Sequence, residues 1–405
     1  MNYEIKTINW IKVIFAPMDT NSVTVQVWFN AGSIYETRDN NWISHFLEHM
    51  FFKWWKKYKT PKEVTEIIDS VWWEMNASTW REHTSYFIKV APEYVNLAVD
   101  VLSDMLVNPN FDEEEIEKEK WVIIQELKMN IDNPHKLLID KFLNFYYWDN
   151  SYGWPVIWTE ENILSFKRDD FVNYKNSLYT KDNMVIVISW DIKNKSELEE
   201  NIWKLFNNLP NKKTLNKPKF IWLSENKNWF YKKWLEQNHI ILAVPWVKIA
   251  DDKKYTFALL STILWWNMSS ILFQELREKL WLCYYVWAYH YAFDDDGLFL
   301  IRAWLDKLNF EKWIWKINEI LDSIVNKQLT EEQLEKAKWF YAGKTKMWIE
   351  TSDELSDYII SQYLSTWKII DLETTLDKLN RVSLSDIFSI VDSLAVDKRY
   401  LYYLD

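Results

Sequence analysis

Two histidines and a glutamate lie within one short segment near the start of the chain, His45-Phe46-Leu47-Glu48-His49. If this segment is helical, His45 and His49 lie one turn apart on the same face, with Glu48 beside them. Two imidazoles at that spacing can bind one metal ion, and the carboxylate can accept a proton from a water molecule at that ion. The alternative interpretation is a helix with two half-buried histidines and a surface glutamate.

The order H-x-x-E-H is the inverted zincin (inverzincin) signature. A catalytic zinc ion needs three protein ligands and one open position, so a third ligand must come from another segment. Residues 112–127 have the pattern of an amphipathic helix with an acidic start. Glu119 and Glu126 share one face of that helix, and the apolar neighbours of Glu126 predict that it points inward, where a metal is a suitable partner. His83 is a weaker ligand candidate.

These residues resemble the insulinase/pitrilysin family of zinc metallopeptidases, and within it the mitochondrial-processing-peptidase-like branch. The resemblance rests on H-F-L-E-H and on a distant glutamate preceded seven residues earlier by another. It implies that His45, His49 and Glu126 bind zinc and that Glu48 is the general base. Glu119 matches a carboxylate that steadies the site. The implied activity is zinc-dependent endopeptidase hydrolysis of unstructured peptides.

A segment for substrate binding is predicted at residues 74–90, whose second half alternates as a strand. Its first half reads as a sheet edge, to which an extended peptide could add by backbone hydrogen bonds. The resemblance implies that Asn76, Ala77 and Thr84 bind substrate here. From the residues alone, the segment is a hairpin whose function stays open.

The second half of the chain carries Arg277 and Tyr284, which could hold a peptide carbonyl and stabilise an oxyanion. The alternative interpretation is a surface arginine and a core tyrosine. The resemblance implies that this pair completes the active site, in a homodimer with composite sites. The competing hypothesis for the whole chain is a non-catalytic peptide-binding or assembly subunit, and a third is that the chain as written folds poorly.

Length and pattern predict two domains in the 405-residue chain. Residues 211–219 are polar, basic and proline-containing, so we interpret them as a linker between domains 1–210 and 220–405. The second domain repeats the order of strands and helices but lacks H-x-x-E-H. We expect an α+β fold of two homologous domains, each a mostly antiparallel sheet covered by helices.

Composition excludes several classes of partner. The net charge is −11 and no long basic run exists, which argues against nucleic acid. We find no signal peptide and no apolar run of membrane-spanning length, so no membrane partner is expected. A single cysteine, Cys283, excludes an internal disulfide and fits a reducing cytoplasm. We expect it to be a small buried residue.

Tryptophan and glycine are present in abnormal numbers, 28 and 4, although glycine is ordinarily about 7% of a globular chain. We hypothesise that most of these tryptophans are glycines in the natural protein, encoded by UGA codons that a variant genetic code reads as glycine. Trp28 and Trp154 fall on no obvious glycine position. The positions that match glycines in the family are Trp10, Trp42, Trp54, Trp72, Trp73, Trp190, Trp265, Trp266 and Trp281.

Overall fold

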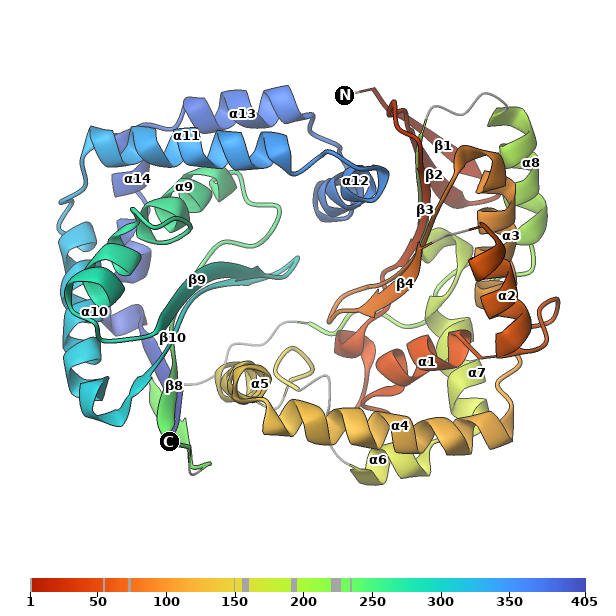
Figure 1. Ribbon diagram of the computed structural model, residues 1–405, viewed down its shortest axis with the longest axis horizontal. Coiled ribbons are helices and arrows are strands. Elements are labelled where there is room, and N and C mark those ends of the chain that lie inside the picture. Colours follow the sequence, from red (N-terminus) through yellow and green to blue (C-terminus); the bar gives the residue numbers. More distant parts are fainter. Residues whose placement is uncertain are drawn as a thin grey trace. The chain divides into compact units, whose positions relative to one another are not determined.

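The computed structural model describes residues 2–53, 55–71, 74–148, 150–154, 160–190, 195–219, 227–233 and 235–405 (Figure 1). The chain forms two compact units. The first contains Met1–Met129, Asp149–Lys219 and Ile349–Ser361, and the second contains Asn130–Trp148, Phe220–Trp348 and Gln362–Asp405. The units therefore change over next to the predicted linker, but each also includes one segment from the other half of the sequence.

The first unit is built on a six-stranded sheet in the order β1-β2-β6-β3-β5-β4. Only β2 and β6 pair in parallel, and all other neighbours are antiparallel. The apolar run of residues 184–189 predicts a central strand, and β6 is buried along its whole length between β2 and β3. The strands are β1 (Glu4–Ile8), β2 (Ile11–Ala16), β3 (Val23–Phe29), β4 (Glu74–Thr79), β5 (Thr84–Val90) and β6 (Met184–Ser189).

Helices cover this sheet, and their starts follow ordinary capping chemistry. Thr60 and Pro61 predict a helix start, and the Thr60 hydroxyl accepts a hydrogen bond from the backbone N–H of Glu63 at 3.1 Å. α3 packs on β3 and β5 and is itself in contact with α8. The helices are α1 (Ile43–Phe51), α2 (Pro61–Val71), α3 (Val95–Val107), α4 (Glu113–Asp132, up to Met129 in this unit), α6 (Glu160–Ser165), α7 (Arg168–Leu178) and α8 (Lys195–Leu205).

The first part of α12 (Ser352–Thr366) also belongs to the first unit and is bound to its sheet by polar contacts. Ser352 is hydrogen-bonded to Thr24 at 2.8 Å, and Asp357 accepts a hydrogen bond from Gln26 at 2.8 Å. Asp353 forms a 2.6 Å ion pair with Lys89. These contacts explain why both faces of β3 are buried although the strand alternates polar with apolar residues.

The second unit has a five-stranded sheet in the order β7-β11-β8-β10-β9, in which only β7 and β11 pair in parallel. Its strands are β7 (Asn228–Tyr231), β8 (Gln237–Pro245), β9 (Tyr285–Ala292), β10 (Gly297–Asp306) and β11 (Tyr400–Leu404). Its helices are α5 (Pro134–Tyr147), α9 (Lys254–Leu264), a π-helical segment (Phe273–Lys279), α10 (Phe310–Val325), α11 (Glu331–Met347), α13 (Leu372–Asn380) and α14 (Leu384–Phe388).

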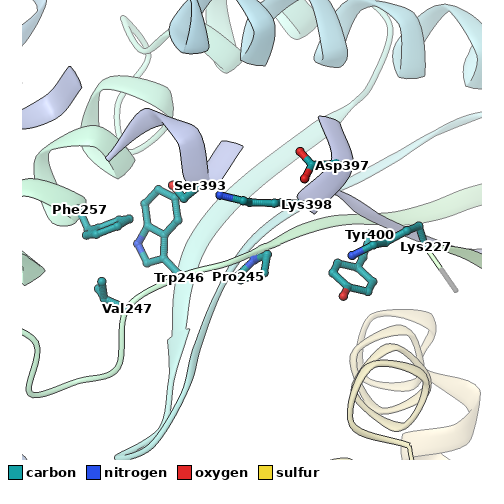
Figure 2. A pocket seen from close by; sticks show the side chains of 9 residues that line it. All are labelled: Lys227, Pro245, Trp246, Val247, Phe257, Ser393, Asp397, Lys398 and Tyr400. Carbon is teal, nitrogen blue, oxygen red and sulfur yellow. The ribbon is translucent and has the colours of Figure 1, made fainter. Parts of the chain in front are cut away.

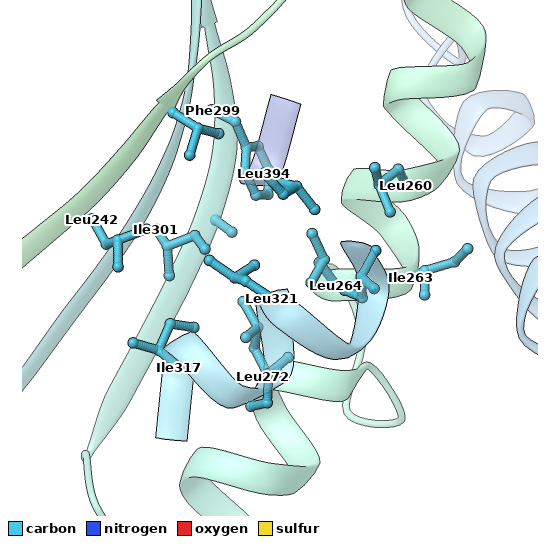
Figure 3. Close-up of a cluster of buried hydrophobic side chains, with 14 of the residues drawn as sticks. Leu242, Leu260, Ile263, Leu264, Leu272, Phe299, Ile301, Ile317, Leu321 and Leu394 are labelled. Atoms are coloured by element: carbon cyan, nitrogen blue, oxygen red, sulfur yellow. The ribbon is translucent and has the colours of Figure 1, made fainter. Parts of the chain in front are cut away.

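The core of the second unit lies between this sheet and its helices. Side chains from β8 and β10, such as Leu242 and Ile301, meet Leu264 of α9 and Leu321 of α10 (Figure 3). Each of these residues is at most 3% exposed. Each unit is thus a mostly antiparallel sheet with helices packed on it, which confirms the predicted α+β class.

Candidate metal centre

Helix α1 presents the motif residues opposite its buried face. Phe46, Leu47 and Met50 are fully or almost fully buried, and this apolar set fixes how the helix packs. His45, Glu48 and His49 are only partly buried. The helical spacing assumed from the sequence is therefore present in the structure.

The start of α1 is held by Glu36, which sequence reasoning missed. Its carboxylate accepts hydrogen bonds from the backbone N–H groups of Trp42 and Ser44, both at 2.9 Å, and from the side chain of Asn41 at 2.6 Å. Burial raises the pKa of Glu36, while these hydrogen bonds act in the opposite direction. A single carboxylate in an irregular segment has no spacing pattern, so no sequence signal identified this role.

Helix α4 brings two carboxylates to the histidines of α1. Glu126 Oε2 lies 3.1 Å from His45 Nε2 and 3.6 Å from His49 Nε2. Glu119 Oε1 lies 2.8 Å from His49 Nδ1. The predicted face of α4 therefore meets the predicted face of α1. Lys53, whose role has no sequence signal, contacts the other oxygen of Glu119.

The three predicted ligands fit a zinc ion. His45, His49 and Glu126 offer one ligand atom each, all within 4.8 Å of one another. Ligand atoms at tetrahedral zinc are about 3.3 Å apart, given bonds of about 2.0–2.1 Å. The 3.1 Å and 3.6 Å separations bracket that value. Two imidazoles and one carboxylate, with a second carboxylate on the free nitrogen of a histidine, are a donor set that zinc favours.

Electrostatics within the group follow from these contacts. The hydrogen bond with His45 and the nearby ring of His49 hold the pKa of Glu126 well below its ordinary value. Burial lowers the pKa of His49, but the hydrogen bond to Glu119 and the nearby carboxylate of Glu126 outweigh this effect and raise that pKa to about 9. Burial raises the pKa of Glu119, and the partners His49 and Lys53 reverse the shift to a net decrease. The carboxylates are thus kept ionised, as metal ligands and their supports must be.

Glu48 is connected to the edge of the sheet. The hydroxyl of Thr79, the last residue of β4, donates a hydrogen bond to Glu48 Oε2. β4 is an edge strand of the first sheet, and among the described strands it pairs with β5 alone. Asn76 on that strand is exposed and Ala77 is partly exposed, so both can be reached by an incoming chain. Thr79 was another residue without a sequence signal.

Two other residues of this hairpin do not belong to the exposed edge. Thr84, predicted to bind substrate, is fully buried and its hydroxyl donates to the carbonyl of Ala31 at 2.6 Å. We therefore correct this prediction and assign Thr84 to the fold. His83 packs against Trp28 with ring centroids 4.3 Å apart, and burial lowers its pKa to about 4. It is not part of the three-ligand group.

Arg277 and Tyr284 belong to the second unit. The guanidinium of Arg277, on the π-helical segment, lies over the ring of Phe273. Tyr284 immediately precedes β9 and is 72% exposed, so the alternative of a core tyrosine is wrong. Their participation in catalysis stays a prediction. Cys283 beside them is buried and unpaired, as expected, and burial raises the pKa of its thiol to about 12.

The second unit also contains a cavity of about 470 Å³ (Figure 2). Lys227 and Lys398 contribute amines, and Asp397 contributes the one carboxylate among the described lining residues. Phe257 and Trp246 form an aromatic wall. A single carboxylate without a histidine offers no zinc ligand set, so the described lining of this cavity forms no second metal centre. In the described part of the chain, no helix is long and apolar enough to cross a membrane.

Comparison with known proteins adds relatives of nearly the same length. A Bacillus subtilis protein named an uncharacterized zinc protease, YmxG, is 31% identical over 95% of this chain and 94% of its own. A Rickettsia bellii protein, also named an uncharacterized zinc protease, is 32% identical over 92% and 90%. Zinc and proteolysis are thus attached to these relatives by name.

Solved structures show the same fold. A protease from Helicobacter pylori matches with a TM-score of 0.91 at 21% identity, covering 100% of this chain and 99% of the other. A peptidase M16 inactive domain from Pseudomonas fluorescens matches with a TM-score of 0.90 at 16% identity, covering 100% and 98%. At these identities the likeness concerns the fold alone.

Two family models cover most of the sequence. Residues 13–160 match the insulinase family, peptidase family M16, and residues 165–341 match the peptidase M16 inactive domain. The first range includes both the H-x-x-E-H helix and the two glutamates of α4. The chain therefore belongs to the insulinase family of peptidases, family M16.

Proposed function

We propose that the protein is a zinc-dependent endopeptidase that hydrolyses unstructured peptides. The observation that carries the proposal is that His45 and His49 of α1 meet Glu126 of α4, with Glu48 beside the histidines on α1. A zinc ion held by the three ligands would act as a Lewis acid and make water a stronger nucleophile at neutral pH. Glu119 would orient His49 through its hydrogen bond.

Glu48 is the proposed general base. One of its oxygens accepts the hydrogen bond from Thr79, which fixes the orientation of the carboxylate and leaves the other oxygen to take a proton from the attacking water. After attack on the scissile carbonyl carbon, Glu48 returns the proton to the departing amine. The peptide C–N bond breaks, and the water supplies the hydroxyl of the new carboxyl group.

The substrate would bind as an added strand along β4. Among the described strands β4 pairs with β5 alone, so its other edge would offer backbone groups to an extended peptide, with little demand on the peptide's sequence. Thr79 is on this strand and also contacts Glu48, so a peptide bound along the edge would run close to the base. Only an unfolded segment can pair in this way, which explains the proposed substrate class.

The second unit would contribute Arg277 and Tyr284, as donors to the substrate and to the developing oxyanion. We propose that they act in a homodimer with composite sites. Zinc, peptide substrates and a second copy of the chain are the partners in this proposal, and a cytoplasmic location is part of it.

The second candidate is a non-catalytic, peptide-binding subunit, favoured by the match of residues 165–341 to a domain described as inactive. Cleavage of an internally quenched peptide by the purified, zinc-loaded protein separates the two. Glu48→Gln should retain zinc and lower the rate by roughly a hundredfold to ten-thousandfold. A wild-type protein that binds zinc and peptide but releases no product would support the second candidate. Unchanged cleavage by Glu48→Gln would refute the assigned base.

A further inference from the structure

Tryptophan occupies backbone conformations that ordinarily require glycine. Nine described residues other than glycine have positive φ, and six of them are Trp10, Trp42, Trp148, Trp266, Trp281 and Trp367. Tryptophan makes up 28 of the 405 residues, so chance would put fewer than one among nine. Positive φ is unfavourable for a residue with a Cβ atom, whereas glycine adopts it without this penalty. No described glycine has positive φ.

The turn between β1 and β2 gives the clearest case. Ile8 pairs with Ile11, which leaves Asn9 and Trp10 as a two-residue loop. Their φ angles are 49° and 73°, and positive φ at both loop positions defines a type I′ turn, for which Asn-Gly is a strongly preferred sequence. Trp10 is 60% exposed, so burial of the indole does not compensate for the strain.

Three more of the six lie at the C-terminal ends of helices. Trp281 has φ 53° and follows the C-cap residue Leu280, and its N–H donates to the carbonyl of Arg277 at 3.2 Å. This is the αL termination motif, in which glycine is the usual residue. Trp367, directly after α12, has φ 55° and donates to Tyr363 at 2.7 Å. Trp148, after α5, has φ 50° and ψ −140°, a region that only glycine adopts readily.

The remaining two are Trp42 and Trp266. Trp42 precedes α1 with φ 93° and ψ −9°, which is the glycine position of a type II turn. Its side chain is fully buried and its indole N–H has no hydrogen-bond partner, which is an unfavourable arrangement. Trp266 has φ 142°, far from the left-handed helical region that other residues occasionally adopt.

We propose that the natural protein has glycine at positions 10, 42, 148, 266, 281 and 367. Composition and resemblance pointed to positions 10, 42, 266 and 281. The backbone adds 148 and 367, which neither had indicated. Trp265, in contrast, has an extended backbone with φ −153°, so the backbone supplies no such argument there. Positions 54, 72 and 73 lie outside the described residues.

Two measurements test this inference without reference to enzymatic activity. The first compares thermal denaturation of the chain as written with a variant in which the four exposed tryptophans of the six, Trp10, Trp148, Trp281 and Trp367, are replaced by glycine. The expected result is a higher midpoint for the variant, or a folded variant where the chain as written aggregates. An equal or lower midpoint would overturn the conformational argument.

The matched control replaces four exposed tryptophans inside right-handed helices by glycine, namely Trp121, Trp203, Trp315 and Trp339. Glycine is unfavourable in a helix interior, so this control should melt at a lower temperature. A rise in both variants would show that removal of exposed indoles, and not backbone conformation, is responsible.

The second measurement is peptide mass spectrometry of the protein purified from its native cells. Glycine masses at the six positions are expected. A tryptophan mass at any of them would refute the proposal for that position, whatever the denaturation experiment gives.

Discussion

Glu119 offers the most direct test of how the proposed zinc site is supported. Its side chain is 5% exposed, and its carboxylate is shared between His49 Nδ1 at 2.8 Å and the amine of Lys53. In Glu119→Gln the hydrogen bond to His49 becomes a neutral one. A charge-assisted hydrogen bond contributes about 1.5–3 kcal/mol, against about 1 kcal/mol for a neutral one.

The loss of about 0.5–2 kcal/mol corresponds to a weakening of zinc binding by a few-fold to about thirtyfold. The new amide N–H group also faces the amine of Lys53, which disturbs the orientation of the side chain. With this second effect, we expect Glu119→Gln to weaken zinc binding about ten- to a hundredfold, the range found when partners of metal-bound histidines are replaced. Competition with a chromogenic chelator at neutral pH measures the affinity.

The control is Glu117→Gln on the same helix, because Glu117 is 68% exposed and pairs with Lys120. It removes the same charge from α4 but touches neither histidine, so zinc affinity should change less than threefold, in line with the small contribution of exposed ion pairs. Equal losses in the two variants would mean that the net charge of α4, and not the contact with His49, controls zinc binding. No loss in Glu119→Gln would refute the supporting role of Glu119.

Three further predictions concern the surroundings of the site. In a quenched-peptide assay, Thr79→Val should lower the cleavage rate about tenfold because it loses the hydrogen bond to Glu48, while its zinc content stays unchanged. Thr79→Ser, which keeps the hydroxyl, should cleave at nearly the wild-type rate. Glu36→Ala should lower the free energy of unfolding by about 3 kcal/mol in urea titration because three donors lose their acceptor, and Glu36→Gln should lose less. Burial lowers the pKa of His83 from 6.5 to about 4, so the unfolded chain binds more protons in that interval. The free energy of unfolding is therefore highest above pH 6.5 and falls by up to about 3 kcal/mol as the pH approaches 4. Urea titrations at several pH values in that interval should show a weaker pH dependence for His83→Asn than for the wild type. The same pH dependence in both proteins would refute the argument.

The predicted site residues on α1 and α4 were accessible from sequence because helical periodicity is local. Spacing alone determines that His45 and His49 share a face, and likewise Glu119 and Glu126. The inward orientation of Glu126 followed from its apolar neighbours. That α4 meets α1 required the resemblance, since periodicity does not say which helices pack together.

The residues that support the site could not be predicted from the sequence, because they belong to no periodic pattern. Glu36, Lys53 and Thr79 act singly: Lys53 and Thr79 each contact a residue distant in the sequence, and Glu36 accepts hydrogen bonds from the segment just before and at the start of α1. Single polar residues in turns and at strand ends have no periodicity, so sequence reasoning cannot separate them from solvated side chains. Thr84 illustrates the converse error, because a hydroxyl on a strand beside the predicted edge is buried and satisfied by Ala31.

The unit to which each helix belongs could also not be predicted from the sequence. The pattern of residues 352–366 predicts a helix but does not identify which sheet it covers. The polar residues Thr24 and Gln26 on β3 would ordinarily be read as facing water, yet they are buried under Ser352 and Asp357. A strand with one polar face can therefore be covered on both faces when the covering helix supplies matching hydroxyl and carboxylate groups.

The glycine proposal affects the two halves of the predicted active site differently. The ligand atoms of His45, His49 and Glu126 are on regular helices, and among the six positions only Trp42 adjoins either helix, at a turn before the first ligand. Position 281 lies between Arg277 and Tyr284, at the termination that leads from one to the other. A strained residue there would displace Tyr284 relative to Arg277, whereas the zinc ligands would keep their helical spacing. We therefore expect the chain as written to lose more of its peptide-cleaving activity than of its zinc affinity. Glycine at position 281 should raise the cleavage rate more than it raises the zinc affinity.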